Sequence, residues 1–271
     1  MINKKIAVCL FGSIGTNKSI GRNTKNSFDK IKYLDYKTPL LSIKKNVIEH
    51  NNADVFIHSW STHKKDEIIK LLNPKKYIFE DYKTFAKPFH SRKNHIWSRF
   101  YTGQVSNDLK KEYELENNFK YDIVLSSRMD LIWFTKLNLN REIENNIFAS
   151  NWNSSKKYGN LGPYDKSNNG DGWGVIDPWF FSSSKNMDKF TQVFKNRKFI
   201  SLKSYFLYKS FLNRFKTFDF KTNNYYISTH HFYYQQAINK GLKFEFDYFR
   251  GFDYEIYRHT LKPGWTNDSN S

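Results

Sequence analysis

The sequence predicts an α/β fold in which helices flank both faces of a mostly parallel central sheet. Two observations support this prediction. Short apolar runs that suit buried strands alternate with segments of helical spacing along the first 200 residues. These runs are continuously apolar, which is typical of strands covered on both faces. We therefore expect an α/β core over residues 1–200. Residues 201–271, rich in aromatic and basic side chains, are expected as an extension packed on it within one continuous domain.

Strands are expected where a short apolar run ends in glycine or in polar residues. In the first of them, "KKIAVCLFG", the apolar run 6–11 is followed by Gly12. A later strand within "GWGVIDPWFF" carries Asp177 in its middle. The other predicted strands are 53–61, 75–81, 121–133, 145–150 and 242–248.

Helices are expected where apolar residues recur at helical spacing. One of them stops at Pro74, and another begins with a serine cap near Ser184. Gly241 is a suitable stop for a later helix. The predicted helices cover residues 39–51, 64–73, 95–115, a segment from about 184, 202–215 and 229–240. Residues 151–171 are expected to form a long substrate loop or a locally disordered segment.

Composition limits the class of protein. Of the 271 residues, 39% are hydrophobic and 18% are aromatic, which suits a folded core rather than a disordered chain. The formal net charge is +18, which favours anionic partners. The codon usage of an AT-rich genome explains much of the lysine excess equally well.

The cysteine count and the apolar runs bear on location. Cys9 is the single cysteine, so no disulfide framework exists and a reducing, cytoplasmic compartment is expected. The apolar run 6–11 is shorter than the core of a signal peptide. No stretch approaches the roughly 20 apolar residues that cross a bilayer. We expect a soluble protein with at most peripheral membrane contact.

Polar residues stand at the ends of three predicted strands. Gly12, His58 and the Arg128/Asp130 pair all lie where an α/β sheet binds its ligands, at the carboxyl ends of the strands. A buried charge is costly unless it is paired or used. Arg128 and Asp130 either neutralise each other or serve a ligand. We favour the second interpretation, because a buried ion pair adds little net stability.

Several familiar motifs are excluded by spacing. "GSIGTNKS" is not a P-loop because Asn17, not glycine, precedes Lys18, and no G-x-G-x-x-G pattern is present. The glycines with Lys18 or Arg22 would still suit a looser phosphate loop, and an ordinary glycine turn is equally consistent. No H-x-x-x-H or C-x-x-C spacing predicts zinc. Asp130 would better suit Mg or Mn.

The order of several segments resembles a group of nucleotide-sugar-dependent glycosyltransferases found in large DNA viruses and bacterial surface-polysaccharide clusters. These segments are "KIAVCLFG", "ADVFIHSWS", "LLNPKKYIFED", "YDIVLSSRMDLIW" and "DPWFFSSSKNMDKF". The resemblance covers residues 4–190, and the second and fourth segments are the specific ones. It implies a GT-A-like fold, a single Rossmann-type domain, in which R-x-D replaces the D-x-D of many relatives.

The resemblance also implies site roles. Asp130 would approach a divalent cation, Mn or Mg, or the donor sugar, and Arg128 would pair with the diphosphate. Because an arginine stands in place of the first aspartate, this motif offers only one carboxylate as a ligand for a metal ion. The implied donor-binding residues are Phe11, Gly12, Arg22, His58, Arg99, Ser127, Arg128 and Asp130.

On this interpretation the chain moves a sugar from a UDP- or GDP-sugar to a hydroxyl of a glycan or glycoprotein acceptor. Asp177 would face the donor sugar or the acceptor hydroxyl and is the first candidate for the base, with Asp171 the second. Aromatic rings suit sugar faces, so Trp173 and Trp179 are expected to bind the acceptor, together with His231.

A different class of function stays open. Lysines interleave with aromatic residues at 203–216, a pattern that would suit nucleic acid or another polyanion. The apolar spacing of this segment is better explained by packing onto the core, and no recognised nucleic-acid module is present. We expect no specific nucleic-acid partner. A sulfotransferase is a weaker third interpretation, because it leaves Arg128-x-Asp130 unexplained.

Overall fold

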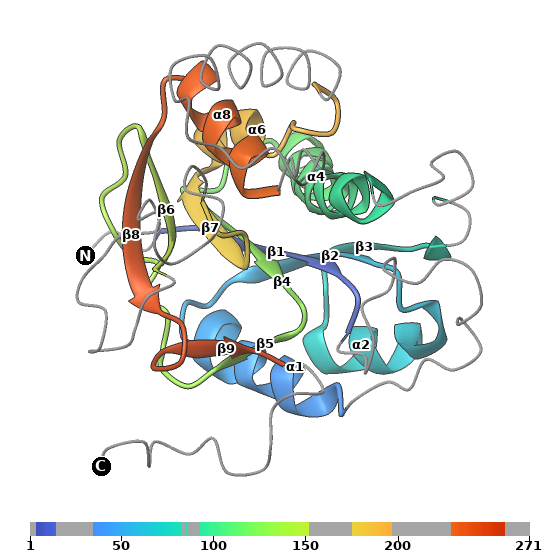
Figure 1. The fold of residues 1–271 in the computed structure, drawn as a ribbon. Coiled ribbons are helices and arrows are strands. Elements are labelled where there is room, and N and C mark those ends of the chain that lie inside the picture. The colour runs from blue at the N-terminus through green and yellow to red at the C-terminus, as the bar shows by residue number, and fades with distance from the viewer. Residues whose placement is uncertain are drawn as a thin grey trace, which may run out of the picture.

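The computed structural model describes residues 4–14, 35–82, 85, 93–151, 175–196 and 229–257. They form an α/β structure with a central mixed sheet between two layers of helices, as the sequence predicts, and this arrangement is compatible with a Rossmann-like fold (Figure 1). Among the described residues, no helix has the length and apolar character to span a membrane.

Within the described residues, seven strands form the central sheet in the order β3-β2-β1-β4-β7-β6-β8. β1 is parallel to β2 and β4, β2 is parallel to β3, and β6 is parallel to β8, whereas β7 runs antiparallel to both of its neighbours. The prediction of a mostly parallel sheet is therefore confirmed. The strands are β1 (Ile6–Gly12), β2 (Asp54–Ser59), β3 (Lys76–Phe79), β4 (Ile123–Arg128), β6 (Asn146–Asn151), β7 (Trp179–Ser183) and β8 (Lys243–Phe249).

Helices cover both faces of the sheet (Figure 1). α4 (Lys93–Glu116), α6 (Ser184–Phe190) and α8 (Thr229–Asn239) lie on one face. On the other face lie α1 (Lys37–Ile43), continued by the π-helical segment Lys44–Glu49, and α2 (Lys65–Leu72), which the 3-10 turn Thr62–Lys64 precedes. Each predicted helix that falls within the described residues is present. The predicted helix 202–215 lies outside them.

Local sequence explains the helix ends. α2 carries acidic residues in its first turn, which the helix dipole favours, and ends at Asn73 in a left-handed conformation just before Pro74. The predicted serine cap is confirmed, because the Ser183 side chain accepts a hydrogen bond from the Asn186 amide. Gly241, at φ +67°, follows α8 as expected of a C-terminal stop.

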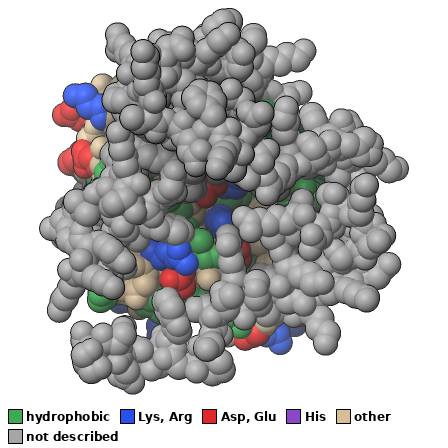
Figure 2. Space-filling view, viewed as in Figure 1, with side chains coloured by type: hydrophobic (Ala, Val, Ile, Leu, Met, Phe, Trp, Pro, Cys, Tyr) green, Lys and Arg blue, Asp and Glu red, His purple; other side chains and the backbone are tan. Residues whose placement is uncertain are grey.

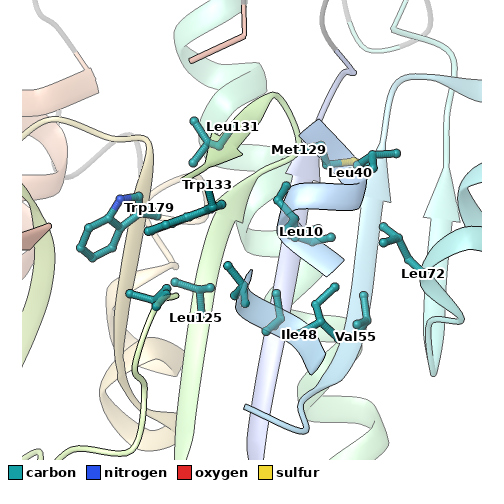
Figure 3. Packing of buried hydrophobic residues seen from close by; sticks show 14 of the residues in the cluster. Leu10, Leu40, Ile48, Val55, Leu72, Leu125, Met129, Leu131, Trp133 and Trp179 are labelled. Atoms are coloured by element: carbon teal, nitrogen blue, oxygen red, sulfur yellow. The ribbon is translucent and has the colours of Figure 1, made fainter. Parts of the chain in front are cut away.

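The core has two layers because successive strand residues face opposite sides. In β1, Val8 and Leu10 pack toward α1 and α2, whereas Ala7 and Cys9 pack toward α4. Figure 3 shows the first layer, where Leu10, Val55 and Leu125 from three strands meet Leu40 and Ile48 from the helical segment 37–49. All of these side chains are buried.

The predicted strand 121–133 is wrong as a single element. β4 ends at Arg128, the chain turns, and β5 (Leu131–Trp133) pairs antiparallel with β9 (Tyr254–Ile256) in a separate small sheet. The partner strand β9 comes from residues more than 100 positions away, so no local pattern reveals this switch. The turn places Arg128 and Asp130 at the end of a central strand.

The predicted position of Asp177 in the middle of a strand is also wrong. β7 begins at Trp179, and Asp177 precedes it. Because β7 runs antiparallel to β4, with Trp179 opposite Ser127, the start of β7 lies beside the carboxyl end of β4. The reversed strand thus carries Asp177 to the edge of the sheet where Arg128 lies.

Candidate functional site

The carboxyl ends of β1, β2 and β4 form one edge of the sheet, and hydrogen bonds tie it to α4. Gly12 has φ +97°, a conformation that favours glycine. Its amide donates to the Thr102 hydroxyl (3.0 Å), and its carbonyl accepts from the Trp60 amide (3.1 Å). The expected donor-binding glycine therefore fixes the ends of two strands against a helix.

His58 is fully buried beneath this edge. The Thr102 hydroxyl donates to the His58 carbonyl (3.2 Å), so its lone pairs accept from the Gly12 amide and from His58 Nδ1 (2.6 Å). This arrangement places the imidazole proton on Nδ1. Nε2 lies 3.6 Å from a Glu80 carboxylate oxygen. Burial lowers the pKa of His58 to about 4, so this contact is not an ion pair at neutral pH.

We expect the stability of the protein to fall as the pH drops from about 6.5 toward 4. The pKa of His58 is depressed by folding, so the unfolded state binds a proton that the folded state excludes, and stability is lost by up to about 1.4 kcal/mol per pH unit. Urea titrations at pH 7 and pH 5 check this for wild type and His58→Asn, with the exposed His50→Asn as control. An unchanged pH dependence in His58→Asn would contradict the assignment.

Arg128 and Asp130 form a bidentate ion pair across the turn after β4. Arg128 Nε donates to Asp130 Oδ1 (2.7 Å) and a terminal nitrogen donates to Oδ2 (2.5 Å). Burial by itself would lower the pKa of Arg128, but the charge and hydrogen bonds of Asp130 outweigh it and raise the pKa. The guanidinium therefore stays charged.

Arg99 and Asp177 form a second ion pair, between α4 and the segment before β7. Arg99 Nε lies 3.2 Å from Asp177 Oδ2, and a terminal nitrogen donates to the Asp177 carbonyl (2.8 Å). The guanidinium lies 3.7 Å from the Phe11 ring centroid and 5.1 Å from that of Tyr233. Burial lowers the pKa of Arg99, although Tyr233 and Asp177 oppose the shift. Two aromatic rings therefore flank Arg99, and its guanidinium contacts both the carboxylate and the backbone carbonyl of Asp177.

Gly103 makes room for this arrangement. A Cβ atom on Gly103 would lie 2.9 Å from a terminal nitrogen of Arg99 and 3.7 Å from the Tyr233 hydroxyl. Sequence reasoning missed Thr102, Gly103 and Tyr233. An isolated glycine inside a helical pattern is a signal that would have pointed to Gly103.

The two ion pairs are electrostatically coupled. The charge of Asp177 raises the pKa of Arg128 as well as that of Arg99, and the charge of Arg128 lowers that of Arg99. Two ion pairs thus lie within electrostatic reach of each other at this edge of the sheet. In Figure 2, basic and acidic side chains lie next to one another near the middle of the visible face.

The remaining expected residues are placed as follows. Ser127 is buried on β4. Trp179 is also completely buried, packed against Trp133 and Phe181, so the structure places it in the core and not on an acceptor-facing surface. Three expected site residues, Arg22, Asp171 and Trp173, lie outside the described residues, and so does the side chain of His231.

The described residues do not by themselves form a binding site for Mn or Mg. A hard cation needs several oxygen ligands. Both oxygens of the Asp130 carboxylate already accept from the Arg128 guanidinium, which would also repel a cation bound there. Nowhere in the described part of the chain do three His, Cys, Asp or Glu side chains cluster in a way that would hold a metal.

No family model matches this chain, and no curated protein matches it either.

Proposed function

We propose that the protein is a glycosyltransferase that moves a sugar from a nucleoside diphosphate sugar, a UDP- or GDP-sugar, to a hydroxyl of a glycan or glycoprotein acceptor. The observation that supports this most is the pair of guanidiniums at the carboxyl end of the central strand β4, each facing a carboxylate. Ligands of α/β sheets bind at this edge. The fold, on this proposal, is a GT-A-like variant of the Rossmann type.

The guanidinium of Arg128 is suited to the charge of the reaction. When the bond between the anomeric carbon and the diphosphate oxygen breaks, negative charge develops on the leaving diphosphate. A guanidinium presents a planar fork that matches phosphate oxygens, and it stays charged in this site. Stabilising that charge lowers the barrier to bond cleavage.

The carboxylate of Asp177 is suited to the acceptor. The acceptor oxygen forms the new bond to the anomeric carbon and gives up its proton, which Asp177 accepts. Its position beside the end of β4 follows from the start of β7 and from its contacts with Arg99. Asp171, the second candidate for the base, lies outside the described residues.

The proposed acceptor is a glycan or glycoprotein, and no specific nucleic-acid partner is proposed. A cytoplasmic site of action is proposed because Cys9, the single cysteine, is a buried free thiol and the chain needs no disulfide.

A thermal-shift panel tests the proposal. UDP-, GDP-, CMP- and dTDP-sugars are each added with Mn, with Mg and with EDTA. A donor at about 100 times its Kd adds about 2.7 kcal/mol, so we expect one nucleotide family to raise the Tm by about 5 °C or more. If no donor stabilises the protein and calorimetry detects no nucleotide binding, the proposal fails. Oligonucleotide binding with a steep salt dependence would then favour the polyanion-binding alternative.

A further inference from the structure

The Arg128–Asp130 pair can open without moving the backbone that carries it. The Arg128 amide donates to the Pro178 carbonyl (3.0 Å), and the Asp130 carbonyl accepts from the Tyr257 amide (2.7 Å). These bonds hold both residues in place independently of their side chains. The side chains are 20% and 12% exposed, so the pair is largely buried but part of each side chain reaches solvent. The backbone positions of the two residues are therefore held by contacts other than the ion pair.

Arg128 is the less enclosed of the two arginines. Arg99 is enclosed between the rings of Phe11 and Tyr233 and holds Asp177 through its backbone as well as its carboxylate. The Arg128 side chain, by contrast, donates to the Asp130 carboxylate and also feels the charge of Asp177 and the Tyr254 hydroxyl. A ligand that offers two anionic oxygens in the same fork geometry would replace the Asp130 carboxylate with little loss.

Asp130 fits this exchange better than it fits a metal. Both oxygens of the Asp130 carboxylate accept hydrogen bonds from the Arg128 guanidinium. In the resting site it neutralises Arg128, which would otherwise be a poorly solvated charge beside Arg99. A carboxylate in this role competes with an anionic ligand for the same guanidinium, whereas a metal-ligating carboxylate would help the ligand to bind.

We propose that this edge of the sheet is a metal-independent diphosphate site, in which Arg128 exchanges its resting partner Asp130 for the diphosphate. The inference rests on the proposed function for the identity of the natural ligand, a nucleoside diphosphate sugar. No covalent bond changes in this step. The ion pair opens, and the guanidinium fork moves from carboxylate oxygens to phosphate oxygens.

The decisive experiment is calorimetry with inorganic pyrophosphate in EDTA, because the two roles of Asp130 predict opposite signs. We expect wild type to bind pyrophosphate without metal and Asp130→Asn to bind it about 5- to 20-fold tighter, which is about 1–2 kcal/mol. Arg128→Gln is expected to bind at least about 10-fold more weakly. Asp66→Asn, which removes an exposed charge on α2, is the matched control and should change the Kd less than about twofold.

The inference is overturned if wild type fails to bind pyrophosphate in EDTA, or if Asp130→Asn binds it more weakly while Tm and circular dichroism show an intact fold. Its failure is distinguishable from that of the proposed function. Donor binding that needs Mn and is lost in Asp130→Asn would keep the transferase and reject the metal-independent site. Tighter pyrophosphate binding by Asp130→Asn, without any response to nucleotide sugars, would keep the anion site and reject the transferase.

Discussion

Replacing Asp177 with asparagine is expected to lower the rate of sugar transfer by about two to four orders of magnitude, the usual contribution of a general base. Asparagine has nearly the same shape but accepts no proton. The backbone should stay in place, because Arg99 also bonds to the Asp177 carbonyl (2.8 Å) and the Arg128 amide bonds to the next carbonyl, that of Pro178 (3.0 Å). Donor affinity is therefore expected to change less than about threefold. The measurement is steady-state transfer with the donor identified by thermal shift, together with its Kd by calorimetry.

Asp66→Asn again serves as the matched control, since it makes the same chemical change on the exposed surface of α2. Two results would count against a base at this position. Near-wild-type turnover would remove Asp177 from the chemistry. A large loss of donor affinity with an unchanged chemical step would make Asp177 a ligand of the donor sugar.

Replacing Lys110 with methionine is expected to destabilise the fold by about 3–5 kcal/mol, the usual cost of removing one partner from a buried ion pair. Lys110 and Glu114 are fully buried on α4, and the Lys110 amine lies 3.1 Å from Glu114 and 2.8 Å from Asp188 of α6. It also donates to the Ser184 hydroxyl (2.6 Å). The amine thus joins two helices and pairs with two carboxylates, of which Glu114 also pairs with Lys120 (2.9 Å). Urea unfolding followed by circular dichroism measures the loss.

The neighbouring Lys111, which is half-buried, provides the control, and Lys111→Met is expected to cost less than about 1 kcal/mol. A loss below about 1 kcal/mol for Lys110→Met would show that Glu114 and Asp188 do not depend on this amine. A second variant, Lys110→Met with Asp188→Asn, should recover part of the loss, because it removes a carboxylate that paired with Lys110, whereas Glu114 keeps the Lys120 amine at 2.9 Å.

Much of the fold could be predicted because its signals are local. A continuous apolar run such as 6–11 predicts a strand from adjacent residues, and Pro74, Ser183 and Gly241 mark helix ends through their own backbone or side-chain chemistry. The polar residues at the carboxyl ends of the predicted strands are local signals as well, and they indicated the candidate site. Arg128 and Asp130 are two residues apart, so their proximity follows from the chain itself.

The switch from β4 to β5 and the position of Asp177 could not be predicted in this way. β5 exists as a strand because β9, more than 100 residues later, pairs with it. Asp177 lies beside Arg99, 78 positions earlier, because β7 inserts antiparallel next to β4. An apolar pattern reports burial but not the neighbour against which a strand is buried.

The sequence by itself determined the α/β class, the mostly parallel sheet and the edge of that sheet where charged residues gather. Each of these depends on the residue types within a short window, which hydrophobic burial and backbone geometry translate directly into strands and helices. Only the tertiary structure decided that His58 is buried, that Trp179 belongs to the core, and that Arg99 holds Asp177 while Gly103 makes room for it. These features depend on contacts between segments far apart in the chain, which come together only after the sheet has formed.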